Sequence, residues 1–252
     1  MKKIGLCLSL CTLSFGTWAA CSYDFDATQA QITAAIPGLS KFPSIIGQIS
    51  SFTVVNSPSP LTYVAANAKA ITGQNKGLPV AQNGIIAYEY KFKAPVTLLP
   101  NNEQMMMYPV YAEAYHSGGK ADIGIVYANH ALGSTTPDKV AIGAGVVNNY
   151  TDLGQIELPV AATADGFQKI GIYINQNSNQ LGIIFNGVNK GYIAHLPGKI
   201  SSLAFTNGYA YTGFETGSSY IGKTFSIELI TDKNKLQFAY PTGTKDLCGN
   251  TL

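Results

Sequence analysis

The feature that most constrains the fold is the stretch Phe167–Ile193, FQKIGIYINQNSNQLGIIFNGVNKGYI. Its first part, KIGIYIN, places isoleucine at every second position, which is the period of a half-buried β-strand. The chain then turns at Asn177–Asn179 and again at Asn186-Gly187, two residues that tolerate the positive φ of a two-residue hairpin. The stretch therefore predicts a meander of three antiparallel strands.

Similar short strand patterns, separated by turn residues, continue along most of the chain. One helix is predicted at Ala27–Ile36, since Asp26 and Gln29 form a capping-box pattern and Pro37-Gly38 ends the segment. Residues 67–84 read as a long surface loop. Crossover helices for a parallel sheet are missing, so an all-β fold is expected, an antiparallel β-sandwich with one short N-terminal helix. The predicted strands are residues 22–26, 51–55, 61–65, 85–93, 105–116, 122–128, 139–147, 155–158, 170–193 as the meander, 200–206, 210–214, 224–231 and 236–240.

The N-terminus has the pattern of a bacterial signal peptide. Met1-Lys2-Lys3 is a charged start, a short apolar run follows it, and Ala19-Ala20 supplies the small residues of a cleavage site. That run is too short for a transmembrane helix, and no later segment is apolar for long enough to span a bilayer. We therefore expect residues 1–20 to be removed and residues 21–252 to form one domain. The localisation predicted is the periplasm, the cell surface or the extracellular space, with no transmembrane segment.

Two cysteines remain after the leader is removed, Cys21 and Cys248. In an oxidising compartment they most simply form one disulfide that joins the two ends of the chain. The chain-entropy model gives such a bond about 4–5 kcal/mol of stabilisation for a loop of roughly 230 residues. The alternative is a lipid anchor at Cys21, because Ala19-Ala20-Cys21 resembles a lipobox, although Trp18 stands where leucine is usual. The disulfide is the favoured interpretation.

Composition argues against several classes of partner. Only 12% of residues are charged, and all 16 basic residues are lysine. Arginine provides the rigid fork used on phosphate and carboxylate, so its absence argues against nucleic-acid recognition. Loss of Lys2 and Lys3 would leave 14 lysines against 14 acidic residues, a net charge of zero. Steering of a partner by net charge is therefore not expected.

The strand Ile85–Lys93 and the later meander with its Asn-Gly turn resemble the jelly roll of the concanavalin-A-like lectin and glucanase superfamily. The resemblance covers roughly residues 60–240 and implies a jelly-roll sandwich. From CSYDFD to Cys248-Gly249, the whole chain also resembles a family of uncharacterised secreted proteins of Gram-negative bacteria. Neither resemblance implies an activity, because one fold serves many functions.

Strand alternation assigns candidate ligand-binding residues to outward faces. In Ile85–Lys93 the buried set is Ile86, Tyr88, Tyr90 and Phe92. In Met105–His116 it is Met106, Tyr108, Val110, Ala112 and Ala114. If the strands share one sheet, tyrosines for stacking on a sugar and polar groups for its hydroxyls would line one surface. The other interpretation is an ordinary β-surface with good cross-strand pairs. The predicted ligand-binding residues are Glu89, Tyr111, Glu113, Tyr115, Tyr173 and Asn175.

The sequence contains only weak matches to the motifs of catalytic sites. Glu89 and Glu113 could form the carboxylate pair of a glycosidase, but the Glu-x-Asp-x-x-Glu motif of the related glucanases is missing. The run Phe167–Gln176 is similar to a strand of polysaccharide lyases on this fold. Those lyases also need an arginine strand and a Gln-x-His motif, and this chain has no arginine and Gln155-Ile156-Glu157 instead. No catalytic residue is therefore assigned.

No metal and no cofactor are predicted either. His116, His130 and His195 are too far apart for a metal signature, and the asparagine-rich loops at 148–152 and 175–179 lack the ordered acidic spacing of a calcium loop. The function favoured is a non-catalytic, lectin-like or adhesin-type binding module whose partner is a glycan or a surface protein. The alternatives are a carbohydrate-active enzyme using Glu89 and Glu113, and a structural protein of the envelope or a surface assembly.

Overall fold

The computed structural model describes residues 23–72, 77–100, 102–131, 139–146 and 151–252, without the side chains of residues 109–111 and 146. The predicted signal peptide and Cys21 lie outside these ranges, so both stay predictions. Within the described ranges, no helix has the length and apolar character needed to cross a membrane.

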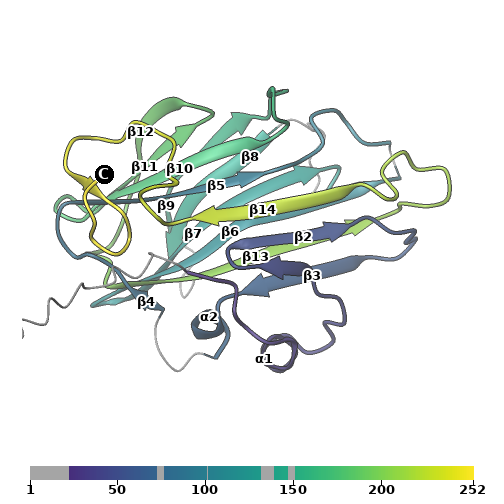
Figure 1. Ribbon diagram of the computed structural model, residues 1–252, viewed down its shortest axis with the longest axis horizontal. Helices are drawn as coiled ribbons and strands as arrows, with labels where there is room; N and C mark the ends of the chain where they lie inside the picture. The colour runs from purple at the N-terminus through teal and green to yellow at the C-terminus, as the bar shows by residue number, and fades with distance from the viewer. Residues whose placement is uncertain (1–22, 73–76, 101, 132–138, 147–150) are drawn as a thin grey trace, which may run out of the picture.

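The protein is a sandwich of two β-sheets, which lie one behind the other in Figure 1. Sheet I has the order β1-β2-β14-β5-β10-β11-β12, with β15 beside β5, and sheet II has the order β3-β13-β6-β7-β8-β9, with β4 beside β13. Neighbouring strands are antiparallel except β15, which runs parallel to β5. The predicted antiparallel β-sandwich is therefore confirmed.

The strands of sheet I are β1 (Ser44–Ile46), β2 (Ile49–Thr53), β5 (Ile85–Phe92), β10 (Gln168–Asn175), β11 (Gln180–Phe185), β12 (Val188–His195), β14 (Thr224–Ile230) and β15 (Thr244–Lys245). Those of sheet II are β3 (Leu61–Ala66), β4 (Leu78–Pro79), β6 (Gln104–His116), β7 (Gly119–Asn129), β8 (Lys139–Val146), β9 (Thr151–Pro159) and β13 (Ser202–Thr212). The predicted meander is β10, β11 and β12, and the two strands predicted at 200–206 and 210–214 are one strand, β13.

Two short helices, α1 (Gln29–Ala35) and α2 (Ala68–Thr72), lie beside β3 and β4 (Figure 1). The capping box of α1 is formed by Thr28 and Gln31, two residues later than predicted, with the Thr28 N–H donating to Gln31 Oε1 at 2.8 Å. Asp26 instead accepts a hydrogen bond from the Ala68 N–H at 2.6 Å, which ties the two helical segments together. Helix α2 lies in the segment predicted to be a surface loop.

The hydrophobic core lies between the sheets. Sheet I contributes the four residues predicted from β5, which are all buried: Ile86, Tyr88, Tyr90 and Phe92. Sheet II contributes Met105 and Met107 together with Ala112 and Ala114. The prediction of Met106 and Tyr108 as core residues is wrong.

The physical reason is a β-bulge in β6. Met107 pairs with Tyr127 and Val110 with Ile125, so β6 has one residue more than β7 across this interval. Pro109, which has no N–H to donate, lies inside it, and bulges are where strands accept proline. The extra residue reverses the alternation, so Met106 and Tyr108 are on the outer face.

A C-terminal strap, residues 232–240, covers part of the outer face of sheet I. It is not the strand predicted at 236–240, because its backbone pairs with a side chain instead of a strand. Glu89 Oε1 accepts hydrogen bonds from the N–H groups of Gln237 at 2.7 Å and Phe238 at 3.0 Å, and from the Tyr240 hydroxyl at 3.1 Å. The rings of Phe238 and Tyr240 lie over Gly171, where a Cβ would come within 2.7 Å of both.

Glu89 is expected to hold the strap through its acceptor oxygen and not through its charge. Burial raises the pKa of Glu89, although the hydrogen bonds from Phe238, Gln237 and Tyr240 act in the opposite direction. Glu89→Gln keeps an oxygen for the three donors, so it should leave the free energy of unfolding unchanged or increased. Glu89→Ala leaves buried donors unpaired and should lower the free energy of unfolding by about 2–3 kcal/mol in urea unfolding.

The raised pKa of Glu89 also makes the free energy of unfolding depend on pH. The folded protein binds a proton at Glu89 more readily than the unfolded chain, so the free energy of unfolding falls as pH rises through the folded-state pKa. The Glu89→Gln variant should lack this component when urea unfolding is repeated over a pH series. A glutamine variant as unstable as the alanine variant would contradict this account.

The beginning and end of the described chain lie close together. The Tyr23 hydroxyl donates to the Pro79 carbonyl at 2.8 Å, and burial followed by the charge of Asp246 raises the pKa of Tyr23. Asp246 is buried and accepts a hydrogen bond from the Cys248 N–H at 3.0 Å. Cys21 lies outside the described residues, so its disulfide with Cys248 stays a prediction.

The intact mass of the mature protein tests the predicted disulfide. We expect a chain that begins at Cys21, carries no acyl group and is two hydrogen atoms lighter than its reduced form. Reduction should also destabilise the protein, because the released chain gains conformational freedom when unfolded. The added mass of acyl chains on Cys21 would establish the lipid-anchored alternative instead.

Candidate ligand-binding face of sheet II

The six residues predicted from sequence are divided between the two sheets. Glu89 is in β5 and Tyr173 and Asn175 are in β10, all in sheet I, whereas Tyr111, Glu113 and Tyr115 are in β6 of sheet II. Outward residues of the two sheets point in opposite directions, so the expectation of one shared surface is wrong. The proposed catalytic pair is wrong for the same reason, because Glu89 and Glu113 cannot flank one glycosidic bond.

The sheet I members are engaged with the chain itself. Glu89 holds the C-terminal strap. Tyr173 is buried, and its hydroxyl donates to Asn189 Oδ1 at 3.0 Å. Asn175 accepts from the N–H of Asn177 at 3.0 Å, inside the turn that follows β10, and donates to the Tyr192 hydroxyl at 3.2 Å.

Two of the sheet II members, Glu113 and Tyr115, form a polar cluster with two residues of β7. Glu113 lies opposite Asp122, and Tyr115 lies opposite Lys120. The Tyr115 hydroxyl and the Lys120 ammonium group each donate to one carboxylate oxygen of Glu113. Burial, then the hydrogen bond to Glu113 and the charges of Glu113 and Asp122, raises the pKa of Tyr115. The backbone of Tyr111 pairs with Thr206 and Gly124, and its side chain lies outside the described residues.

A hollow of about 410 Å³ lies beside this cluster, over strands β7, β8 and β9. The floor of the hollow is bare backbone. Glycines, which have no side chain to cover it, lie at alternate positions of β8 and at one position of β7. A Cβ at Gly124 would meet nothing within 4 Å. The floor glycines are Gly124, Gly143 and Gly145, and the polar lining residues are Asp122, Thr151, Asp152 and Gln155.

Two carboxylates face each other across this hollow. In register, Asp122 pairs with Gly145, and Gly145 pairs with Asp152, so the three residues form one row across three strands. Strand spacing puts the outer two backbones about 9–10 Å apart. Asp122 is buried, whereas Asp152 is exposed, with its Oδ1 held by the Gly154 N–H at 2.8 Å. The geometry can present acceptor oxygens to both sides of a small polar molecule.

An apolar hollow of about 320 Å³ lies farther along the same face, over β3, β13 and β6. Met106 and Tyr108, displaced outward by the bulge, line it together with Val64 and Ile36. Gly208 forms part of its floor. The outer face of sheet II therefore combines a polar hollow, a tyrosine-bearing apolar hollow and the Glu113 cluster between them.

The charge of this face is mainly negative. Lys120 is paired with Glu113, and Lys139 Nζ is 3.0 Å from Glu157 Oε2. Among the described residues, the polar hollow is lined by Asp122 and Asp152 and by no cationic side chain. In the part of the chain that the structure describes, no group of three or more His, Cys, Asp or Glu residues could hold a metal ion.

Sequence reasoning missed Asp122, Asp152 and Gln155. A signal for them was present, since IGAGV places glycine at two alternate positions of one strand and GIV places one glycine in the strand before it. Such spacing leaves one face of a sheet without side chains, which is a reason to examine the polar residues beside it.

Several solved structures are similar to this one. A prokaryotic β-1,3-1,4-glucanase (lichenase) derived from a mouse hindgut metagenome is 13% identical, with a TM-score of 0.45 over 82% of this chain and 95% of that chain. The Emp47p carbohydrate recognition domain is 7% identical, with a TM-score of 0.43 over 74% and 90%. Alginate lyase A1-II′, of polysaccharide lyase family-7, is 12% identical, with a TM-score of 0.41 over 72% and 76%.

These likenesses concern the fold alone. No curated protein sequence matches the chain. A family model described as a domain of unknown function, DUF4882, matches residues 4–250, and the chain therefore belongs to the DUF4882 family.

Proposed function

We propose that this protein is an exported binding module that holds a carbohydrate on the outer face of sheet II. The observation that carries the proposal is the polar hollow, with its glycine floor between Asp122 and Asp152. A sugar ring has hydroxyls around its edge and apolar C–H faces, so it needs acceptors at the sides of a site and an open or aromatic floor. The polar hollow supplies acceptors at its sides, and Tyr108 in the apolar hollow supplies an aromatic side chain.

Charge supports a particular class of sugar. The described lining of the polar hollow has two carboxylates and no cation, so a uronic acid would meet repulsion there. Gln155 and Thr151 can both donate and accept hydrogen bonds. The site is therefore suited to a neutral or amine-bearing sugar unit.

The hydrogen bonds that Glu113 accepts favour a binding role for this site over hydrolysis. Both of its carboxylate oxygens accept hydrogen bonds, from Tyr115 and Lys120. A carboxylate held in this way orients its neighbours, whereas a catalytic acid must present a proton to the glycosidic oxygen. The export predicted from residues 1–20 is consistent with a protein that meets glycans outside the cytoplasm.

One observation favours a second candidate function, a glycoside hydrolase. Glu113 and Asp122 lie directly opposite each other, which puts their Cβ atoms about 4.5–5.5 Å apart. Retaining glycosidases hold their two carboxyl groups about 5–5.5 Å apart. This pair replaces Glu89 and Glu113 as the only carboxylate pair from β6 that the register supports for such chemistry.

Filling the polar hollow tests the proposed function. Gly124→Val adds a side chain into open space on a strand where β-branched residues are favoured, so the fold should keep its stability. Oligosaccharide binding, found on a glycan array and measured by calorimetry, should fall by at least about tenfold, since the side chain occupies the ligand's volume. The control is Ser226→Val on the outer face of sheet I, which should bind like wild type. Equal binding by both variants would contradict the proposed site.

Turnover assays separate binding from hydrolysis. We expect the wild-type protein to retain oligosaccharides from a polysaccharide panel without releasing reducing ends. Glu113→Gln and Asp122→Asn should change affinity, because they alter the hydrogen bonds and charge next to the hollow. Cleavage by wild type that is lost in both variants would establish the hydrolase in place of the binding module.

A further inference from the structure

A separate hollow of about 410 Å³ lies at one end of sheet I. It is where β5 ends and where β14 and β10 begin, so the antiparallel order of these neighbouring strands brings the three segments together. Its lining comes from residues 93–97, from Gly166 and from residues 220 and 223–225. This hollow is distinct from the two hollows of sheet II.

Two lysines, Lys93 and Lys223, are among the residues that line this hollow. Each lies over an aromatic ring: Lys93 Nζ is 4.8 Å from the ring centre of Phe167, and Lys223 Nζ is 4.1 Å from that of Tyr220. A ring favours the position of a cation but does not neutralise its charge. The two lysines are therefore oriented and still charged.

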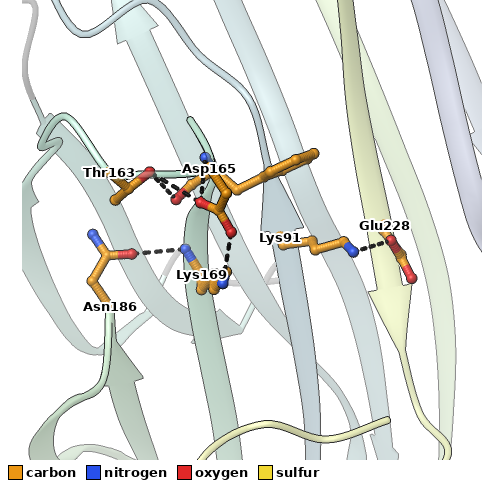
Figure 2. Close-up of polar contacts among 7 residues, drawn as sticks. Lys91, Thr163, Asp165, Lys169, Asn186 and Glu228 are labelled. Carbon is orange, nitrogen blue, oxygen red and sulfur yellow. Dashed lines mark hydrogen bonds and ion pairs between the residues drawn. The ribbon is translucent and has the colours of Figure 1, made fainter.

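The neighbouring carboxylates are committed to other lysines, as Figure 2 shows. Glu228 is 2.7 Å from Lys91 Nζ, and Asp165 is 2.8 Å from Lys169 Nζ. Lys169 lowers the pKa of Asp165 to about 2, so this ion pair persists at neutral pH. No Asp or Glu lines the hollow, and among the described residues neither Lys93 nor Lys223 has a carboxylate within 4.0 Å.

We propose that this hollow binds a phosphate group, held between the ammonium groups of Lys93 and Lys223. Two lysine charges beside one hollow suit a dianion, and lysine is a common phosphate ligand where no bidentate fork is needed. Thr97 and Thr224 add hydroxyls to the lining. The hollow has the size of a small-molecule site. A soluble phosphomonoester and a phospholipid headgroup carry this same chemistry.

The test titrates inorganic phosphate and glycerol phosphate into the isotope-labelled protein and follows backbone amide shifts by NMR. Saturable shifts are expected at Gly166, Thr97 and Thr224, with dissociation constants that rise with salt because the interaction is between exposed charges. Lys93→Gln and Lys223→Gln should each weaken binding by about tenfold, since each removes one of two charges. Sedimentation with vesicles of anionic or neutral phospholipid then identifies the source. Saturable shifts together with pelleting by anionic but not neutral vesicles indicate a headgroup, and saturable shifts without pelleting indicate a free phosphomonoester.

Lys91 provides a matched control. Its Nζ is 5.4 Å from the ring centre of the same Phe167, but it is paired with Glu228 and does not line the hollow. Lys91→Gln should therefore change phosphate affinity by less than about twofold. The proposal is overturned if no shift saturates, if shifts spread over all surface lysines, or if the Lys91 variant loses as much affinity as the other two.

Discussion

The rest of the structure depends on one constraint: every long strand buries one of its faces in the core between the two sheets. Tyr88 and Tyr90 from one sheet and Tyr127 and Phe205 from the other are almost fully enclosed, and a shift of one residue in any of their strands would expose them. The register fixed by this core also fixes the opposite faces. The position of Glu113 opposite Asp122 is thus a consequence of packing on the far side of β6 and β7.

The periodicity of the sequence was enough for the fold class and for the buried face of β5, because that strand is regular from Ile85 to Phe92. It was not enough for the part of β6 that precedes Pro109, because one extra residue at the bulge reverses the faces of the strand there. Alternation tells which side of a strand a residue occupies, but it does not tell which sheet the strand joins. Glu113 and Glu89 were grouped for that reason, although they lie on opposite outer surfaces.

Other features depend on contacts distant in sequence. The C-terminal strap has no regular pattern of its own, and Glu89, roughly 150 residues earlier, satisfies its backbone. The row Asp122–Gly145–Asp152 likewise requires the pairing of β7 with β8 and of β8 with β9. Both candidate sites rely on such pairings, and they have opposite charge: carboxylates line the hollow on sheet II, and lysines line the hollow at the end of sheet I.

The strand order of sheet I also determines when the fold can form. Strands β1 and β2 reach the rest of the sheet only through β14, which lies between β2 and β5 although it is close to the end of the chain. A chain that crosses a membrane with its N-terminus first would therefore carry two unattached strands until about nine-tenths of it had emerged. Attachment of β1 and β2, and with it the completion of sheet I, is therefore a late event in folding.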